Sequence, residues 1–168
     1  GAGGFIGGYI VDEVLNRGYE AWAGVRQTTS REYLADERIV FVDLDYTHPE
    51  HLKEQLLQLK HEMGGWDYII HNLGVTKCKK KGDFYRINYE YVRNFVDALI
   101  ACDMVPCKFI YISSLSAFGK GDEVNHTPIK LTDTPNPDTN YGKSKLMTEN
   151  YLASLKDFPY IILRPTGV

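Results

Sequence analysis

Short apolar runs alternate with longer amphipathic segments along almost the whole chain. The runs lie at residues 20–25, 39–42, 68–71, 109–112 and 160–163. The segments between them carry apolar residues three and four positions apart, which predicts helices ahead of Gly18 and Gly64, over 84–102 and over 141–155. Strands that alternate with helices at this rhythm form βαβ units with right-handed crossovers. The sequence therefore predicts an α/β fold built on a doubly wound parallel sheet.

The length of the chain suits a single domain. It has 168 residues, of which 43% are apolar, enough for a sizeable core. The chain opens inside a glycine motif and stops at Val168, just after the last predicted strand. We expect the natural protein to have a first strand ahead of Gly1, in the middle of the sheet, and further residues after Val168.

The opening motif is Gly1-x-x-Gly4-x-x-Gly7, and a predicted helix follows it directly. A glycine-rich turn that enters a helix lets backbone N–H groups approach a phosphate, and the helix dipole favours the negative charge. The motif therefore predicts a phosphate-binding turn. The alternative is a flexible glycine-rich end.

Tyr141 and Lys145 lie four residues apart near the start of the last predicted helix, so both side chains share one helical face. An ammonium held beside a phenol favours the phenolate, which makes such a tyrosine a candidate general acid and base for a carbonyl/alcohol couple. Taken alone, the pair is more typical of a helix surface. Ser114 follows the predicted strand at 109–112, and a hydroxyl at this position can hydrogen-bond a substrate carbonyl. The alternative is that Ser114 is part of a serine-rich turn without a ligand.

The second predicted strand ends at Val25-Arg26, with Thr28, Ser30 and Arg31 close behind. In doubly wound folds this strand end meets the adenosine ribose of a dinucleotide. A guanidinium with hydroxyls nearby suits a 2′-phosphate, so the sequence favours NADP over NAD. The alternative is an exposed loop arginine without a ligand.

Charge and composition exclude several other classes of protein. The formal net charge of -3 does not suggest binding to nucleic acid or to a membrane surface. No apolar run approaches a membrane span, and there is no signal peptide. The three cysteines have no metal-ligand spacing and indicate a reducing compartment, so we expect a cytoplasmic protein without a metal site.

Several motifs, taken together and in order, resemble those of the extended short-chain dehydrogenase/reductases, the group with nucleotide-sugar epimerases and dehydratases. The resemblance covers essentially all 168 residues. Its marks are Gly1-x-x-Gly4-x-x-Gly7, Asp43-Leu44, His71-Asn72-Leu73-Gly74, Asn88, Ser113-Ser114 before Phe118-Gly119, Tyr141-Gly142-Lys143-Ser144-Lys145 with Glu149, and Arg164-Pro165. It implies a Rossmann-type NAD(P)-binding domain over residues 1–168, here without its first strand and without the C-terminal region that grips the substrate.

The resemblance also implies a role for each matching residue. Tyr141 would be the catalytic acid and base, Lys145 would hold the nicotinamide ribose and favour the phenolate, and Ser114 would hydrogen-bond the reacting oxygen. The remaining residues would bind the cofactor: Gly1, Gly4 and Gly7 at the pyrophosphate, Phe5 and Ile6 within the same glycine motif, Arg26 at the ribose, Asp43 and Leu44 at the adenine, Leu73 along the channel, Asn88 in the supporting hydrogen-bond network and Pro165 near the nicotinamide.

The predicted function is an NAD(P)-dependent oxidoreductase, epimerase or dehydratase that acts on a nucleotide sugar or a small carbonyl compound. Val25-Arg26 resembles the NADPH-using reductase branch more than the epimerases, and Asn72-Leu73-Gly74 and Phe118 depart from the usual family pattern. The resemblance implies dimers through the helix that carries Tyr141 and its neighbour. The alternative function is a non-enzymatic, dinucleotide-sensing regulatory module on the same fold.

Overall fold

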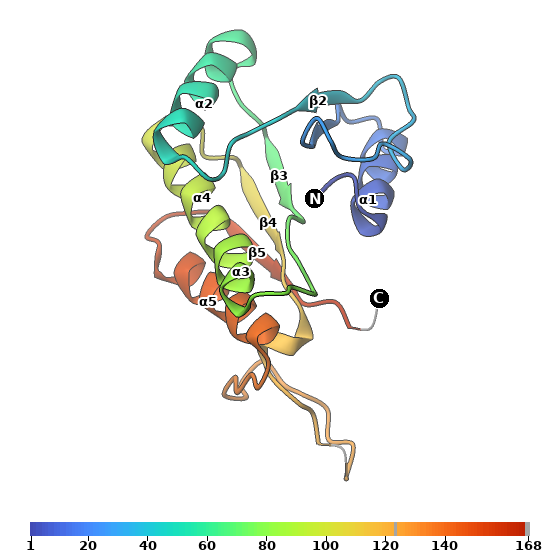
Figure 1. The fold of residues 1–168 in the computed structure, drawn as a ribbon, viewed down its shortest axis with the longest axis vertical. Helices are drawn as coiled ribbons and strands as arrows, with labels where there is room; N and C mark the ends of the chain where they lie inside the picture. The colour runs from blue at the N-terminus through green and yellow to red at the C-terminus, as the bar shows by residue number, and fades with distance from the viewer. Residues whose placement is uncertain (123, 167–168) are drawn as a thin grey trace.

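The computed structural model describes residues 1–122 and 124–166, in which helices and strands alternate as predicted (Figure 1). The elements are α1 (Phe5–Asn16), β1 (Trp22–Gly24), β2 (Val40–Val42), α2 (Pro49–Met63), β3 (Tyr68–His71), α3 (Lys81–Tyr85), a π-helical turn (Arg86–Glu90), α4 (Tyr91–Ala101), β4 (Lys108–Ile112), a 3₁₀ turn (Leu115–Ala117), α5 (Asn140–Ser154) and β5 (Tyr160–Leu163). None of the helices described is long and apolar enough to cross a membrane.

All strand pairs are parallel, which confirms the predicted fold class. β1 pairs with β2, and β3, β4 and β5 form a second sheet in that order. Gly1 lies beside the end of β3, where its carbonyl accepts a hydrogen bond of 3.4 Å from Asn72 Nδ2. The strand expected ahead of Gly1 stays a prediction.

The main core lies between the three-stranded sheet and the helices α2, α4 and α5, which run along one side of it (Figure 1). Its fully buried members include Leu52 and Leu56 from α2, Phe109 and Tyr111 from β4, and Leu152 from α5. A smaller cluster joins α1 to β1 and β2. The loops at the carboxyl ends of the strands are thereby held between rigid elements.

Three local predictions differ from the structure. The apolar run at 39–42 predicts a buried parallel strand. In the structure Val40 is exposed on β2, whose partner among the described strands is β1. Thr47-His48-Pro49-Glu50 has the spacing of a capping box, which predicts Thr47 as the N-cap of the helix. In the structure the Thr47 hydroxyl donates to Asp45 and His48 is the N-cap. The predicted 84–102 helix contains the π-helical turn, whose extra residue moves the buried face from Tyr91 to Val92.

A long connection leads from the 3₁₀ turn to α5. Its described residues, 118–122 and 124–139, contain no helix or strand and extend away from the sheet (Figure 1). The connection begins with Gly119, which has a φ of 95°, and a Cβ there would lie 2.2 Å from the Asn136 carbonyl oxygen. The start of the connection therefore lies close to Asn136, and the Asn136 N–H donates a hydrogen bond of 3.0 Å to the Phe118 carbonyl.

Candidate active site

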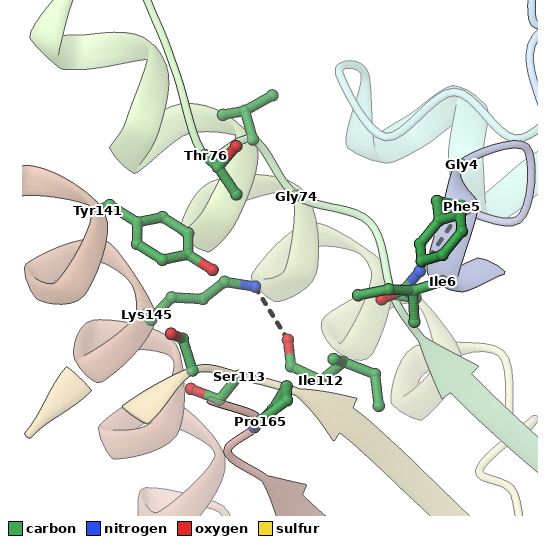
Figure 2. A pocket seen from close by; sticks show the side chains of 14 residues that line it. Gly4, Phe5, Ile6, Gly74, Thr76, Ile112, Ser113, Tyr141, Lys145 and Pro165 are labelled. Atoms are coloured by element: carbon green, nitrogen blue, oxygen red, sulfur yellow. Dashed lines mark hydrogen bonds between the residues drawn. The ribbon is translucent and has the colours of Figure 1, made fainter. Parts of the chain in front are cut away.

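A cavity of about 730 Å³ opens where the carboxyl ends of β3, β4 and β5 meet the first turns of α1 and α5 (Figure 2). Ligands in open α/β sheets collect at this edge. The lining residues are Gly1, Gly4, Phe5, Ile6, Asn72, Gly74, Val75, Thr76, Ile112, Ser113, Ser114, Tyr141, Lys145 and Pro165. The three predicted catalytic residues therefore line the same cavity as four of the five cofactor-binding residues predicted in the glycine motif, Gly7 being the exception.

Tyr141 is positioned by the start of α5. Thr139 caps this helix, and its hydroxyl accepts a hydrogen bond of 3.0 Å from the Gly142 N–H. A Cβ on Gly142 would lie 2.2 Å from the Ser116 carbonyl oxygen. Because glycine has no side chain, the first turn of α5 packs directly on the 3₁₀ turn that follows Ser114. This contact brings Tyr141 and Ser114 to one cavity.

Lys145 lies one helical turn further along α5 and is only 5% exposed. Its amine donates a hydrogen bond of 2.9 Å to the Ile112 carbonyl oxygen, and Nζ lies 5.9 Å from the centroid of the Tyr141 ring (Figure 2). Burial lowers the pKa of Lys145 from 10.5 to about 8, and the nearby Glu149 carboxylate opposes this shift. The amine is therefore mostly protonated at neutral pH, and with three donors it keeps hydrogen-bonding capacity for a further partner.

The two serines after β4 have different partners. The Ser114 Oγ accepts a hydrogen bond of 3.2 Å from the Ser116 N–H, which leaves its own proton free to be donated into the cavity. The Ser113 hydroxyl donates to the buried Glu149 carboxylate. Ser114 is thus the serine whose proton can reach a bound molecule.

The glycine segment forms the opposite wall of the cavity, with Gly4, Phe5 and Ile6 facing the Tyr141 side (Figure 2). The first turn of α1 has neither a capping side chain nor an acidic residue. A Cβ on Gly7 would lie 2.2 Å from the Gly1 carbonyl oxygen, so glycine is needed for the turn to fold over the helix start. The N–H groups at such a helix start suit a phosphate, so this wall fits a dinucleotide.

Six predicted cofactor-binding residues lie outside the cavity lining: Gly7, Arg26, Asp43, Leu44, Leu73 and Asn88. Gly7 is buried beneath the glycine turn, and Leu44 is 7% exposed in the main core. Arg26 is exposed in the loop after β1. The Asp43 carboxylate accepts a hydrogen bond of 3.1 Å from the Gln27 N–H, which joins the loop after β2 to the loop after β1. Arg26 and Asp43 are therefore found together at one end of the smaller sheet.

Asn88 lies behind the cavity and is fully buried in the π-helical turn. Its amide accepts a hydrogen bond of 2.8 Å from the Val75 N–H and donates to the Val75 carbonyl at 3.0 Å. It also donates to the Ser144 hydroxyl at 3.0 Å. Asn88 therefore joins the loop after β3 to α5 and holds the cavity wall at Val75.

Sequence reasoning did not assign Asn72, Gly74, Val75, Thr76, Ile112 or Ser113 to the site, although all six line the cavity. All of them lie at or just beyond the carboxyl ends of β3 and β4. The signal that marks them is their position at these strand ends, since residue type alone does not distinguish a valine or an isoleucine here from one in the core.

The fold and the cavity define a Rossmann-type α/β domain with a tyrosine–lysine pair at the carboxyl edge of its sheet. Comparison with known proteins is more specific. The chain belongs to the NAD dependent epimerase/dehydratase family, whose model matches residues 1–168. This membership confirms the predicted resemblance.

Two curated relatives illustrate the range of the family. An uncharacterised protein of Sinorhizobium fredii is 30% identical over an alignment of 152 positions that covers 84% of this chain and 37% of that protein. The sterol-4-alpha-carboxylate 3-dehydrogenase (decarboxylating) of Dictyostelium discoideum is 25% identical over an alignment of 175 positions that covers 98% of this chain and 50% of the dehydrogenase. The chain thus spans at most half the length of these two relatives.

Solved structures show the same fold. The UDP-Glc/GlcNAc 4-epimerase of Campylobacter jejuni has a TM-score of 0.80 at 21% identity, covering 98% of this chain and 51% of the epimerase. The UDP-glucose 4-epimerase of Brucella ovis, solved in complex with NAD, has a TM-score of 0.79 at 21% identity, covering 98% of this chain and 49% of the epimerase. At this identity the likeness establishes the fold alone.

Proposed function

We propose that the chain is the cofactor-binding and catalytic part of an NAD(P)-dependent oxidoreductase, epimerase or dehydratase. The observation that carries this proposal is that Tyr141, Lys145 and Ser114 line one cavity with Gly1 and Gly4. Family membership also favours an enzyme over the alternative of a non-enzymatic dinucleotide sensor.

Each of the three side chains has a chemical role in this proposal. Tyr141 exchanges a proton with the reacting oxygen of the substrate. Ser114 donates a hydrogen bond to the same oxygen, and the positive charge of Lys145 favours the phenolate form of Tyr141. When bound, the nicotinamide supplies or takes up the hydride. The N-terminal turn of α1 would hold the pyrophosphate. Ile112 and Pro165, which line the cavity, would lie beside the nicotinamide.

We further propose that the cofactor is NADP, with Arg26 at its 2′-phosphate. Arg26 is exposed in the loop after β1, close to the Asp43 carboxylate that the Gln27 N–H holds. The similar structure from Brucella ovis was solved with NAD, so NAD is the competing candidate. Direct titration with NADPH and NADH decides between the two.

The substrate, the assembly and the location are proposals as well. A nucleotide sugar is supported by the UDP-sugar epimerases among the similar structures, and a carboxylated sterol by the Dictyostelium relative. A homodimer through α5 and its neighbour α4 and a cytoplasmic location are further proposals. The cysteines are free, which suits a reducing compartment.

The test of the function is a Tyr141→Phe variant, measured for both binding and turnover. We expect NADH or NADPH to bind with an affinity within about twofold of the unmodified protein, because the phenol does not form the pyrophosphate wall. Turnover should fall by about 10²–10⁴-fold, the usual contribution of a positioned acid and base. Turnover within a few-fold of the unmodified protein would refute the proposed role of Tyr141, and failure to bind either cofactor would refute the function.

A further inference from the structure

A buried ion pair lies directly behind the catalytic cavity. The Glu149 side chain is 5% exposed, and Arg164, next to the cavity residue Pro165, is 23% exposed. The guanidinium binds the carboxylate with two donors, Nε at 3.0 Å from Oε1 and Nη2 at 2.8 Å from Oε2. Arg164 also lies over the Phe118 ring, 4.8 Å from its centroid. A bidentate pair of this kind fixes both side chains in one geometry.

The same carboxylate is connected to Lys145 through the end of β4. Ser113 donates its hydroxyl to Glu149, and the Ser113 N–H donates to the Leu163 carbonyl at 2.7 Å. The residue before Ser113 is Ile112, whose carbonyl accepts the Lys145 amine at 2.9 Å. Since Lys145 and Glu149 are one turn apart on α5, these contacts form a closed ring between α5 and the strand end.

We propose that Ser113, Glu149 and Arg164 act as a positioning clamp, which holds the Lys145 amine in the cavity and fixes the ends of β4 and β5 against α5. Its consequence for catalysis rests on the proposed function. The clamp residues act through Lys145: Glu149 and Arg164 do not line the cavity, and the Ser113 hydroxyl is already engaged by Glu149.

The charges around Lys145 give the clamp a second effect. Burial lowers the pKa of Lys145 to about 8, and Glu149 is the group that raises it again. The other titratable side chains facing the amine are Tyr111, Tyr141 and His71. Burial raises the pKa of Tyr111 above its ordinary range and lowers the pKa of His71 to about 3, so both are neutral at pH 7. Glu149 is therefore the negative charge that helps Lys145 stay protonated in its buried position.

The test is the titration of Lys145 in Glu149→Gln, followed by NMR of protein labelled at the lysine ε-carbons. The Lys145 resonance is assigned by its loss in Lys145→Arg. We expect the titration midpoint to fall by about one pH unit, because the carboxylate no longer favours the ammonium. Removing the Ser113 hydroxyl in Ser113→Ala should produce a smaller fall, since Glu149 and Arg164 remain paired.

Thr148→Val is the matched control. Thr148 is fully buried on the same turn of α5 and donates to the Asn88 carbonyl, outside the clamp. This variant should lose stability and leave the Lys145 midpoint unchanged. An unchanged midpoint in folded Glu149→Gln, or an equal fall in Thr148→Val, would overturn the proposal. If Glu149→Gln does not fold, Ser113→Ala decides: a fall in its midpoint supports the clamp, and no fall overturns it.

The titration is made without cofactor, so its outcome is independent of whether the protein binds NAD(P). A second measurement connects the clamp to function. The affinity for NADPH, the proposed cofactor, followed by fluorescence, should weaken about three- to tenfold in Glu149→Gln at pH 8 and less at pH 6, where Lys145 is protonated in both proteins. Absence of binding of both NADPH and NADH in the unmodified protein would refute the proposed function. Unchanged NADPH affinity in folded Glu149→Gln at pH 8 would overturn the positioning role, and equal weakening at the two pH values would overturn the effect of the Glu149 charge on Lys145.

Discussion

Burial of a charged lysine costs folding free energy, so replacing Lys145 should stabilise the protein while removing its function. Lys145 is 5% exposed, and its pKa is about 8 instead of 10.5. Each unit of pKa difference between the folded and the unfolded chain is about 1.36 kcal/mol, so burying the charged amine costs about 3 kcal/mol of folding free energy at pH 7. Lys145→Met also loses the hydrogen bond to the Ile112 carbonyl, which costs about 1 kcal/mol. We therefore expect the variant to be more stable than the unmodified protein by about 2 kcal/mol at pH 7.

The lowered pKa of Lys145 also determines how the free energy of unfolding changes with pH. Below pH 8 Lys145 is protonated in both the folded and the unfolded chain, and the full burial cost applies. Between pH 8 and 10.5 the folded protein gives up the proton while the unfolded chain keeps it, so the free energy of unfolding rises with pH. Above 10.5 both forms are neutral and the cost has disappeared. The unmodified protein should therefore gain about 3 kcal/mol relative to Lys145→Met over this range.

Urea unfolding followed by tryptophan fluorescence, at intervals from pH 7 to 10.5, measures the effect. Groups that do not interact with Lys145 contribute equally to the stability of both proteins and cancel in the difference. A difference in stability that stays constant within about 0.5 kcal/mol across the range would refute the argument from burial. Lys145→Met should also bind NADH more weakly, because the amine that would hold the ribose is lost.

Two further substitutions test how the site is built. Gly142→Ala should destabilise the protein by about 1–3 kcal/mol and lower turnover, because the added Cβ would lie 2.2 Å from the Ser116 carbonyl oxygen. Gly82→Ala, where a Cβ meets nothing within 4 Å, is the matched control in chemical denaturation and should be neutral or slightly stabilising. Arg26→Ala should weaken NADPH binding at least tenfold, about 1.4 kcal/mol, and leave NADH binding nearly unchanged. Arg17 is an exposed arginine paired with Glu13, so Arg17→Ala is the control and should change the affinity for neither cofactor in the same fluorescence titration. Equal losses of NADPH and NADH affinity in Arg26→Ala would refute a contact with the 2′-phosphate.

Local patterns predicted the elements of this fold because each depends on neighbours in the sequence. The glycines ahead of α1, the apolar run of β4 and the four-residue spacing of Tyr141 and Lys145 all follow from the geometry of one turn, one strand or one helix. The order of alternation also predicted a parallel sheet, since a strand, a helix and a strand in succession can pack compactly in few other ways. The proposed catalytic residues Tyr141, Lys145 and Ser114 and most of the glycine segment could therefore be singled out from the sequence, and in the structure they line one cavity.

Other features depend on segments that meet only in the folded chain. The π-helical turn shifts the buried face to Val92 and aims Asn88 at Val75, and the hydrophobic period alone gave no sign of that extra residue. Arg164 and Glu149 are on different elements, so nothing local predicts that they pair.

The sequence by itself determined the fold class and the family and indicated the side chains proposed to react, because these depend on short-range spacing and residue type. The tertiary structure decided which residues surround them. Thr76, Ile112 and Ser113 belong to the site because parallel strands end at a common edge. It also decided that Lys145 is buried beside Glu149, and so how readily its proton leaves, because the electrostatic environment of a charge is the sum of groups brought together from the whole chain.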